Sequence, residues 1–190
     1  MKKEEVFASS FLVLNRGFEK KNAIMITVEK GMTILGVDPG LASIGWAVLE
    51  KESKINLLAY GCIKTPKGED FSQRLELIFS QVKALAEKYH LKVLAVEELY
   101  FAKNVKTAIK VAQCLGVIKL AGRELGLTVV EYTPLNIKMT ITGYGRAEKK
   151  QIEYMINQTL KLKKKITPHH AADAVAVALT HVYTNHKLKF

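Results

Sequence analysis

The stretch TILGVDPGLASIGWAVLE, residues 33–50, limits the possible folds more than any other part of the chain. Its first apolar run ends on Asp38, Pro39-Gly40 breaks that run at once, and a second strand-like run covers residues 45–49. An ionised carboxylate at the end of a buried strand is costly unless it is paired or bound to a metal ion. Asp38 therefore either begins the turn or is held there for a chemical purpose.

The pattern that continues from this stretch predicts a mixed α/β fold. Residues 33–38, 44–50 and 54–64 alternate as three successive strands, and residues 50–53 are short enough for a hairpin turn. Later elements are expected to be helices over residues 72–90, 105–125, 134–140, 147–160 and 168–184 and strands over 92–98 and 127–132. This order describes a five-stranded mixed sheet with helices on both faces.

The charge balance indicates a polyanionic partner. The 190 residues carry 29 Lys and Arg against 18 Asp and Glu, a formal net charge of +11. Such an excess suits nucleic acid, and a basic but inert surface is the alternative. The two cysteines, Cys62 and Cys114, have no CxxC spacing, which favours a reducing cytoplasm.

The first 31 residues differ from the rest of the chain. Their apolar stretch, residues 6–14, is short and interrupted by serines, which argues against a signal peptide or a membrane anchor. Met32 stands directly before the first well-patterned strand. We therefore expect residues 1–31 to be an N-terminal extension outside the native fold, residues 32–185 to form one domain, and residues 186–190 to be a tail.

Two strands of the expected sheet end on a carboxylate. Glu97 closes the run VLAVE as Asp38 closes the first strand. A right-handed crossover can place two such strands side by side, and sites in open α/β sheets lie beyond the carboxyl ends of the strands. Taken alone, each acid has an ordinary explanation, as a turn or a solvated strand end, and Glu98 competes with Glu97.

The segment TPHHAADAVAVAL supplies a third group of candidates. With Thr167 as the N-cap and Pro168 as the first helical residue, His170 and Asp173 become neighbours on one helix face. The alanines of this segment make a thin helix, able to pack close to a sheet. Three carboxylates and an imidazole from three elements suffice to hold hard divalent cations, although a histidine in a first turn is often only a surface residue.

Four motifs together carry a resemblance to a known family. GVDPG, VEELYFAKN, GYGRAEKKQI and HHAADAVAVALTH, in this order and spacing, resemble the RuvC family of Holliday-junction resolvases over residues 32–183. The resemblance implies a ribonuclease H-like fold and a cytoplasmic homodimer. It also implies paired nicking of four-way DNA junctions with magnesium or manganese, in association with a branch-migration helicase complex.

The resemblance also implies roles for single residues. The family's catalytic acids fall on Asp38, Glu97 and Asp173, and the remaining position, which holds Asp or His in different members, is His170. Whether His170 binds metal or moves a proton stays open. Two Mg²⁺ ions about 3.5–4 Å apart suit phosphodiester hydrolysis, and Mn²⁺ is expected to substitute. We expect Asp38 to bridge them, Glu97 to hold one, and Asp173 with His170 to hold the other.

DNA contacts are expected around the site. The family match places an intercalating aromatic at Tyr100, where stacking on a base contributes about 1–3 kcal/mol; an aromatic that covers the sheet end is the alternative. The Gly-rich turn before residue 147 is expected to seat a phosphate at a helix N-terminus. The further expected DNA contacts are Phe101, Lys103, Asn104, Lys138, Arg146, Lys149 and Lys150. A solvated basic face is the alternative for these lysines.

Other functions fit parts of the same pattern. A non-catalytic basic DNA-binding module, an actin-like or sugar-kinase ATPase, and a nuclease acting on RNA or another branched nucleic acid are the rivals. The chain has neither the length nor the second Gly-rich loop of the ATPases.

The helix over residues 105–125 is the expected dimer contact. Ile109, Leu115 and Leu120 are expected on or near one of its faces, together with small residues such as Ala108 and Ala112. The helix carries more small and apolar residues than one buried face requires, which favours a contact with a second copy. A helix sandwiched within the monomer is the alternative.

Overall fold

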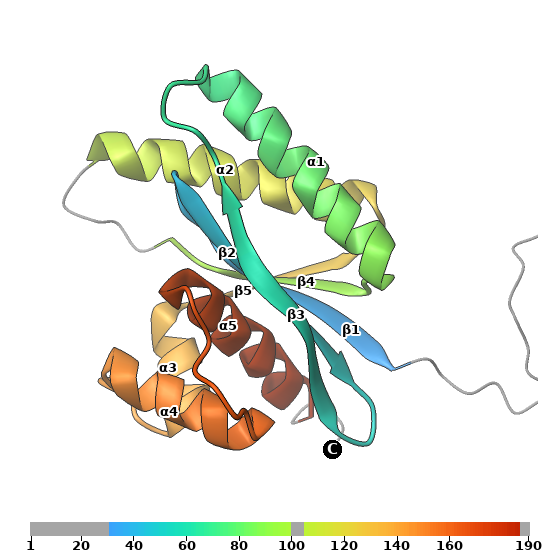
Figure 1. The fold of residues 1–190 in the computed structure, drawn as a ribbon, viewed down its shortest axis with the longest axis vertical. Helices are drawn as coiled ribbons and strands as arrows, with labels where there is room; N and C mark the ends of the chain where they lie inside the picture. The colour runs from blue at the N-terminus through green and yellow to red at the C-terminus, as the bar shows by residue number, and fades with distance from the viewer. Residues whose placement is uncertain (1–30, 100–104, 187–190) are drawn as a thin grey trace, which may run out of the picture. The chain divides into compact units, whose positions relative to one another are not determined.

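A five-stranded mixed sheet with helices on both faces forms the centre of the fold (Figure 1). The computed structural model describes residues 31–99 and 105–186, and the side chains of residues 31–99 and 105–184. The strands are β1 (Met32–Asp38), β2 (Ser43–Lys51), β3 (Ile55–Lys64), β4 (Val93–Glu97) and β5 (Thr128–Tyr132). The helices are α1 (Phe71–Tyr89), α2 (Val105–Glu124), α3 (Pro134–Thr142), α4 (Lys149–Leu160) and α5 (His169–His186). The predicted fold class and element order are confirmed.

The sheet order brings the two acid-bearing strands together. The strands are arranged β3-β2-β1-β4-β5, with β1 antiparallel to β2, β2 antiparallel to β3, and β4 parallel to both β1 and β5. In the β1–β4 pair, Val37 lies opposite Val96. Asp38 and Glu97 are the next residues on the two strands, so they leave the sheet at the same edge.

Alternation along the strands decides on which face these acids lie. Val37 and Val96 pack into the core beneath α1 and α2, whereas Ala95 packs into the core beneath α5. Because side chains of a strand alternate between faces, Asp38 and Glu97 belong to the α5 face. In Figure 1, α1 and α2 cover one face of the sheet, and α3, α4 and α5 cover the other.

Small residues let α5 lie directly on the sheet. A Cβ atom at Gly36 would overlap the Ala174 carbonyl oxygen, and one at Gly45 would overlap the carbonyl oxygen of His170. Both glycines are therefore required by the close approach of α5 to β1 and β2. The predicted close packing of this helix is confirmed. The helix begins at His169, however, so Pro168 precedes it instead of being its first residue.

Helix α2 does not keep the predicted grouping of its apolar residues on one face. Ile109 and Leu120, expected on the same face as Leu115, are 56% and 61% exposed. The buried residues are Cys114, Leu115, Ile118, Ala121 and Gly122. Helix α2 is thus rotated so that its second apolar stripe faces outward, because one helix face is enough to cover the sheet. Within the described ranges, no helix is long and apolar enough to cross a membrane.

Candidate metal and catalytic site

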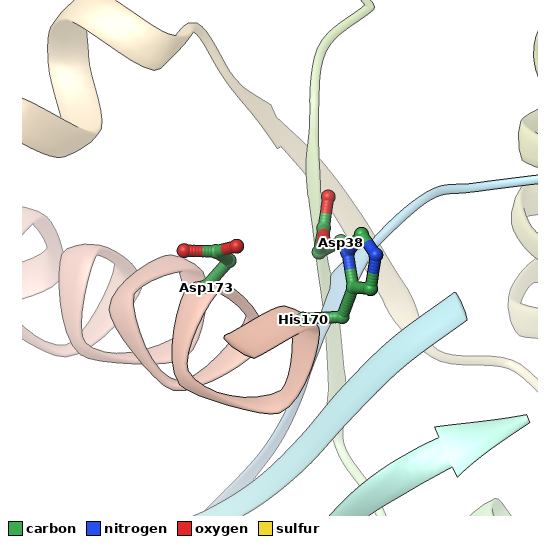
Figure 2. Close-up of side chains that lie close together, drawn as sticks. All are labelled: Asp38, His170 and Asp173. Carbon is green, nitrogen blue, oxygen red and sulfur yellow. Dashed lines mark hydrogen bonds and ion pairs between the residues drawn. The ribbon is translucent and has the colours of Figure 1, made fainter. Parts of the chain in front are cut away.

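Asp38, His170 and Asp173 form a cluster beyond the carboxyl end of β1. Each offers one potential ligand atom, and these atoms all lie within 4.8 Å of one another. Figure 2 shows His170 and Asp173 on the first turns of α5, beside Asp38 at the end of β1. The three residues meet because the α5 face of β1 carries Asp38, while Gly45 lets the first turn of α5 approach β2.

His170 is tied directly to Asp38. Its Nδ1 lies 2.7 Å from Asp38 Oδ2. Because an ionised carboxylate can only accept hydrogen bonds, Nδ1 is the donor in this pair, and in a neutral imidazole the lone pair then lies on Nε2. The His170 side chain is 53% exposed, against 16% for Asp38. The hydrogen bond therefore orients the imidazole, and about half of the side chain stays open to solvent.

Lys149 forms an ion pair with the cluster. Its Nζ lies 2.6 Å from Asp173 Oδ2. The sequence indicated Lys149 only as a DNA contact, and nothing in its spacing revealed this pairing, which depends on how α4 packs against α5. The ion pair places a positive charge at the rim of a site that is otherwise acidic.

Glu97 lies close enough to the cluster for the charges of Asp38 and Asp173 to affect its ionisation. Burial raises its pKa to about 7, and the negative charges of Asp38 and Asp173 push the pKa in the same direction, against Lys149 and Lys138. Burial also raises the pKa of Asp38, against the hydrogen bond from His170. Packing these carboxylates together opposes their ionisation, and a bound cation would relieve that opposition.

The donor set fits a divalent metal ion. Carboxylate oxygens are the preferred ligands of Mg²⁺ and Mn²⁺, and a neutral imidazole nitrogen is an acceptable further ligand. Asp38 and Asp173 could provide oxygens and His170 a nitrogen, and Glu97, which is not part of this cluster, could add a further oxygen. Three acids whose mutual repulsion is only partly offset by Lys149 and Lys138 form an arrangement that a cation would stabilise.

Glu97→Gln is expected to stabilise the metal-free protein at alkaline pH. Folding raises the pKa of Glu97 from 4.5 to about 7, so the stability that this group contributes below pH 4.5 is lost as pH rises through 7. Gln keeps the shape without the charge. In EDTA, the thermal midpoint of the variant should exceed that of the wild type at about pH 8 and differ much less at about pH 5.

Glu98→Gln is the matched control for this measurement, because Glu98 is the adjacent acid and its side chain is exposed. It should shift the thermal midpoint little at either pH. An equal midpoint for Glu97→Gln and the wild type in alkaline EDTA would contradict the raised pKa of Glu97.

A buried carboxylate on α4 fixes the entry into α5. Glu153 Oε2 lies 2.6 Å from Lys165 Nζ, and its Oε1 lies 2.9 Å from His169 Nδ1. The hydrogen bond from Lys165 lowers the pKa of Glu153 most strongly. The sequence did not indicate this contact. It anchors the residue directly before His170 to α4.

The expected DNA contacts divide into two groups. Tyr100, Phe101, Lys103 and Asn104 lie outside the described residues. Of the others, Arg146, Lys149 and Lys150 are exposed and Lys138 is partly buried. Glu148 is the N-cap of α4, with Gln151 Oε1 accepting from its N–H at 2.7 Å. A carboxylate thus already stands at the helix N-terminus where a phosphate seat was expected, and it would repel a phosphate there.

A family model and similar proteins all point to one protein family. The model of the family "Crossover junction endodeoxyribonuclease RuvC" matches residues 34–181. A protein of that name from Clostridioides difficile is 45% identical over 155 residues, which cover 81% of this chain and 92% of the relative. The Petrotoga mobilis protein of that name is 48% identical over 151 residues, 79% of this chain and 93% of the relative.

Solved structures of Holliday-junction resolvases also match this fold. Thermus thermophilus RuvC in complex with a Holliday junction substrate matches with a TM-score of 0.79 and 32% identity, covering 82% of this chain and 96% of that one. The yeast mitochondrial resolvase Ydc2, at 14% identity and a TM-score of 0.65, shares the fold. The predicted ribonuclease H-like fold is thereby confirmed. By its family match and its relatives, the chain belongs to the RuvC family of crossover junction endodeoxyribonucleases.

Proposed function

We propose that this protein is a metal-dependent endonuclease that resolves four-way DNA junctions by hydrolysing a phosphodiester in each of two strands, in recombination and DNA repair. The proposal rests mainly on the cluster of Asp38, His170 and Asp173, whose potential ligand atoms lie within 4.8 Å of one another. The chain that holds these acids has a net charge of +11. A basic binding module would gain nothing from acids that repel phosphate. The family membership supports the same reaction.

Asp38, Glu97, His170 and Asp173 would hold the metal ions, for which we propose two Mg²⁺ with Mn²⁺ as a substitute. When bound, such ions activate water and offset the negative charge that gathers on the phosphate. Asp38 is our choice for the shared ligand because it is hydrogen-bonded to His170 and is close enough to both other acids for their charges to repel its own. Glu97 would hold one ion, and Asp173 with His170 the other.

His170 is oriented for either of two roles. Its Nδ1–H is anchored on Asp38, so its Nε2 faces away from that carboxylate. An anchored imidazole with a free lone pair can donate that pair to a metal or accept a proton from water. The hydrogen bond fixes the ring in both cases, which supports a function at the reacting centre over a surface role.

Positive side chains would guide DNA to these acids. Lys149, on Asp173, and Lys138, whose charge opposes the raised pKa of Glu97, stand beside the cluster. Arg146 and Lys150 are exposed on the same segment as Lys149. We assign phosphate contacts to these side chains and not to the α4 N-terminus. Tyr100, Phe101, Lys103 and Asn104 follow directly after β4, so we propose that they contact the junction, with Tyr100 stacking on a base.

We propose that two copies assemble through α2, since a two-fold enzyme offers one active site to each equivalent strand of a junction. The outward stripe of this helix consists of Val105, Ile109, Ala112, Gly116 and Leu120, all of them exposed. Their spacing of four, three, four and four residues makes one continuous apolar strip along the helix. An apolar strip of this kind suits a copy of itself across a two-fold axis.

Ile109→Glu should therefore convert the dimer to a monomer, because it places two like charges in the shared strip. Sedimentation velocity at micromolar concentration measures this directly. Leu135→Glu is the control, since Leu135 on α3 is 58% exposed and Ile109 is 56% exposed. A wild-type protein that sediments as a monomer both free and bound to a junction would contradict this assembly.

Cleavage assays test the function itself. The protein should nick a synthetic four-way DNA junction symmetrically with Mg²⁺, leaving 5′-phosphates, and should do so neither in EDTA nor on linear duplex of the same sequence. Binding without cleavage in any divalent metal would favour a non-catalytic module. Faster cleavage of an RNA junction than of the DNA junction would show that RNA is the preferred substrate.

We place the reaction in the cytoplasm, where the free Cys62 and Cys114 stay reduced, alongside a branch-migration helicase complex.

A further inference from the structure

Helix α1 carries a buried guanidinium that contacts the loop after Asp38. Arg74 is 7% exposed. Its Nη2 donates to the Leu41 carbonyl oxygen at 2.6 Å and to Thr65 Oγ1 at 2.8 Å, and its Nε donates to Thr65 Oγ1 at 3.1 Å. The Thr65 hydroxyl donates to the Leu41 oxygen at 2.6 Å, and the Thr65 N–H donates to the Ala42 oxygen at 3.2 Å. We call this closed network the Arg74 clamp.

The charge of Arg74 is unusual for its position. Among the residues that the structure describes, its polar partners are a hydroxyl and a carbonyl, and no carboxylate forms an ion pair with it. A buried charge without an opposite charge is costly, and an apolar side chain of similar size often serves stability as well or better. Core stability alone therefore does not account for an arginine at this position.

The clamp holds the loop that connects Asp38 to the strand against which His170 packs. Residues 39–42 join Asp38 at the end of β1 to Ser43 at the start of β2. Gly40 allows the turn to close, because a Cβ there would overlap the Ser43 carbonyl oxygen. Beyond the loop, Gly45 lies against the backbone of His170. Because Asp38 is paired with Gly45 in the β1–β2 ladder, a shift of this loop would disturb Asp38 and the support of His170 together.

We infer that Arg74 is a positioning residue for the metal site, which it serves through the Leu41 carbonyl and the Thr65 hydroxyl. The inference rests on the proposed function, because it takes Asp38 and His170 as metal ligands. The guanidinium is suited to the task, since its planar fork binds two acceptors at once in fixed directions. It ties α1, the end of β3 and the loop after Asp38 into one rigid unit.

Mn²⁺ binding to the full-length protein without DNA tests this inference, with the free Mn²⁺ signal in electron paramagnetic resonance as the readout. Arg74→Met and Thr65→Val should each weaken binding by about tenfold, the loss typical of a removed partner of a metal ligand. Arg74→Lys should restore part of the affinity, since an ammonium can still donate to the Leu41 oxygen. Lys83→Met is the matched control, because it removes a partly exposed cation from the same helix, where Lys83 Nζ is paired with Glu124 at 3.3 Å.

The results of these measurements distinguish a role of Arg74 in positioning the metal site from a role in stabilising the fold alone. If Arg74 only stabilised the fold, the variants would melt earlier but bind Mn²⁺ within about twofold of the wild type, and the inference would be wrong. If Arg74→Met does not fold, Thr65→Val decides by the same criterion. A wild-type protein that does not bind Mn²⁺ would contradict the metal site itself, and this inference with it. Normal wild-type binding with unaffected variants would contradict only the clamp.

Discussion

Asp38→Asn is expected to reduce nicking of a four-way junction to below about 1% of the wild-type rate. The substitution keeps the shape of the side chain and its capacity to accept from His170 Nδ1, which lies 2.7 Å away. It removes the negative charge that faces both His170 and Asp173. Since that charge is the one proposed to be shared by two metal ions, its loss should abolish cleavage while the fold and junction binding remain. Single-turnover nicking at saturating protein measures the rate apart from affinity.

Asp70→Asn is the control for this loss of charge. Asp70 caps α1, accepting from the Ser72 N–H at 2.8 Å, and it is fully exposed. Asparagine is about as good a cap as aspartate, so neither stability nor nicking should change appreciably. A folded Asp38→Asn protein that keeps more than a few percent of wild-type nicking would overturn the assignment of Asp38 as the shared ligand.

The sheet was predictable because its signals are local and regular. Each strand alternates or forms a short apolar run, and the handedness of β-α-β connections leaves few ways to arrange β1 and β4. The proximity of Asp38 and Glu97 follows from those rules, and the register of Val37 with Val96 confirms it. The assignment of both acids to the α5 face needed the structure, because it depends on which helices cover which side of the sheet.

Contacts that depend on helix placement were not predictable in this way. Lys149 and Asp173 meet only because α4 and α5 pack together, and no periodicity links residues 24 positions apart. The burial of Arg74 had no signal in the sequence, since arginine is rarely buried without a carboxylate. The grouping of Ile109 and Leu120 with Leu115 on one face of α2 was wrong, because that helix has two apolar stripes and only tertiary packing selects the buried one. The roles of Tyr100, Phe101, Lys103 and Asn104 stay predictions.

Lys149→Met should have opposite effects on metal binding and on cleavage. Lys149 Nζ lies 2.6 Å from Asp173 Oδ2, so in the metal-free protein it competes with any cation for that oxygen. Without it, Mn²⁺ should bind more tightly, by about threefold or more, since the site becomes more negative. Nicking at saturating metal and junction should nevertheless fall by about 100-fold. The reason is that a preformed positive charge beside the reacting phosphate is lost, and one such donor typically contributes about 10²–10³ in rate.

Lys150→Met separates this effect from a general loss of positive charge. Lys150 is the next residue, is also exposed, and is proposed to contact a phosphate. Its removal should weaken junction binding and lower the slope of log affinity against log salt by about 0.9, the value of one phosphate contact. The rate at saturating junction and the Mn²⁺ affinity should change little. If Lys149→Met behaved like Lys150→Met, with weaker junction binding but an unchanged maximal rate and unchanged Mn²⁺ affinity, Lys149 would be a DNA contact only. Its ion pair with Asp173 would then have no part in the reaction.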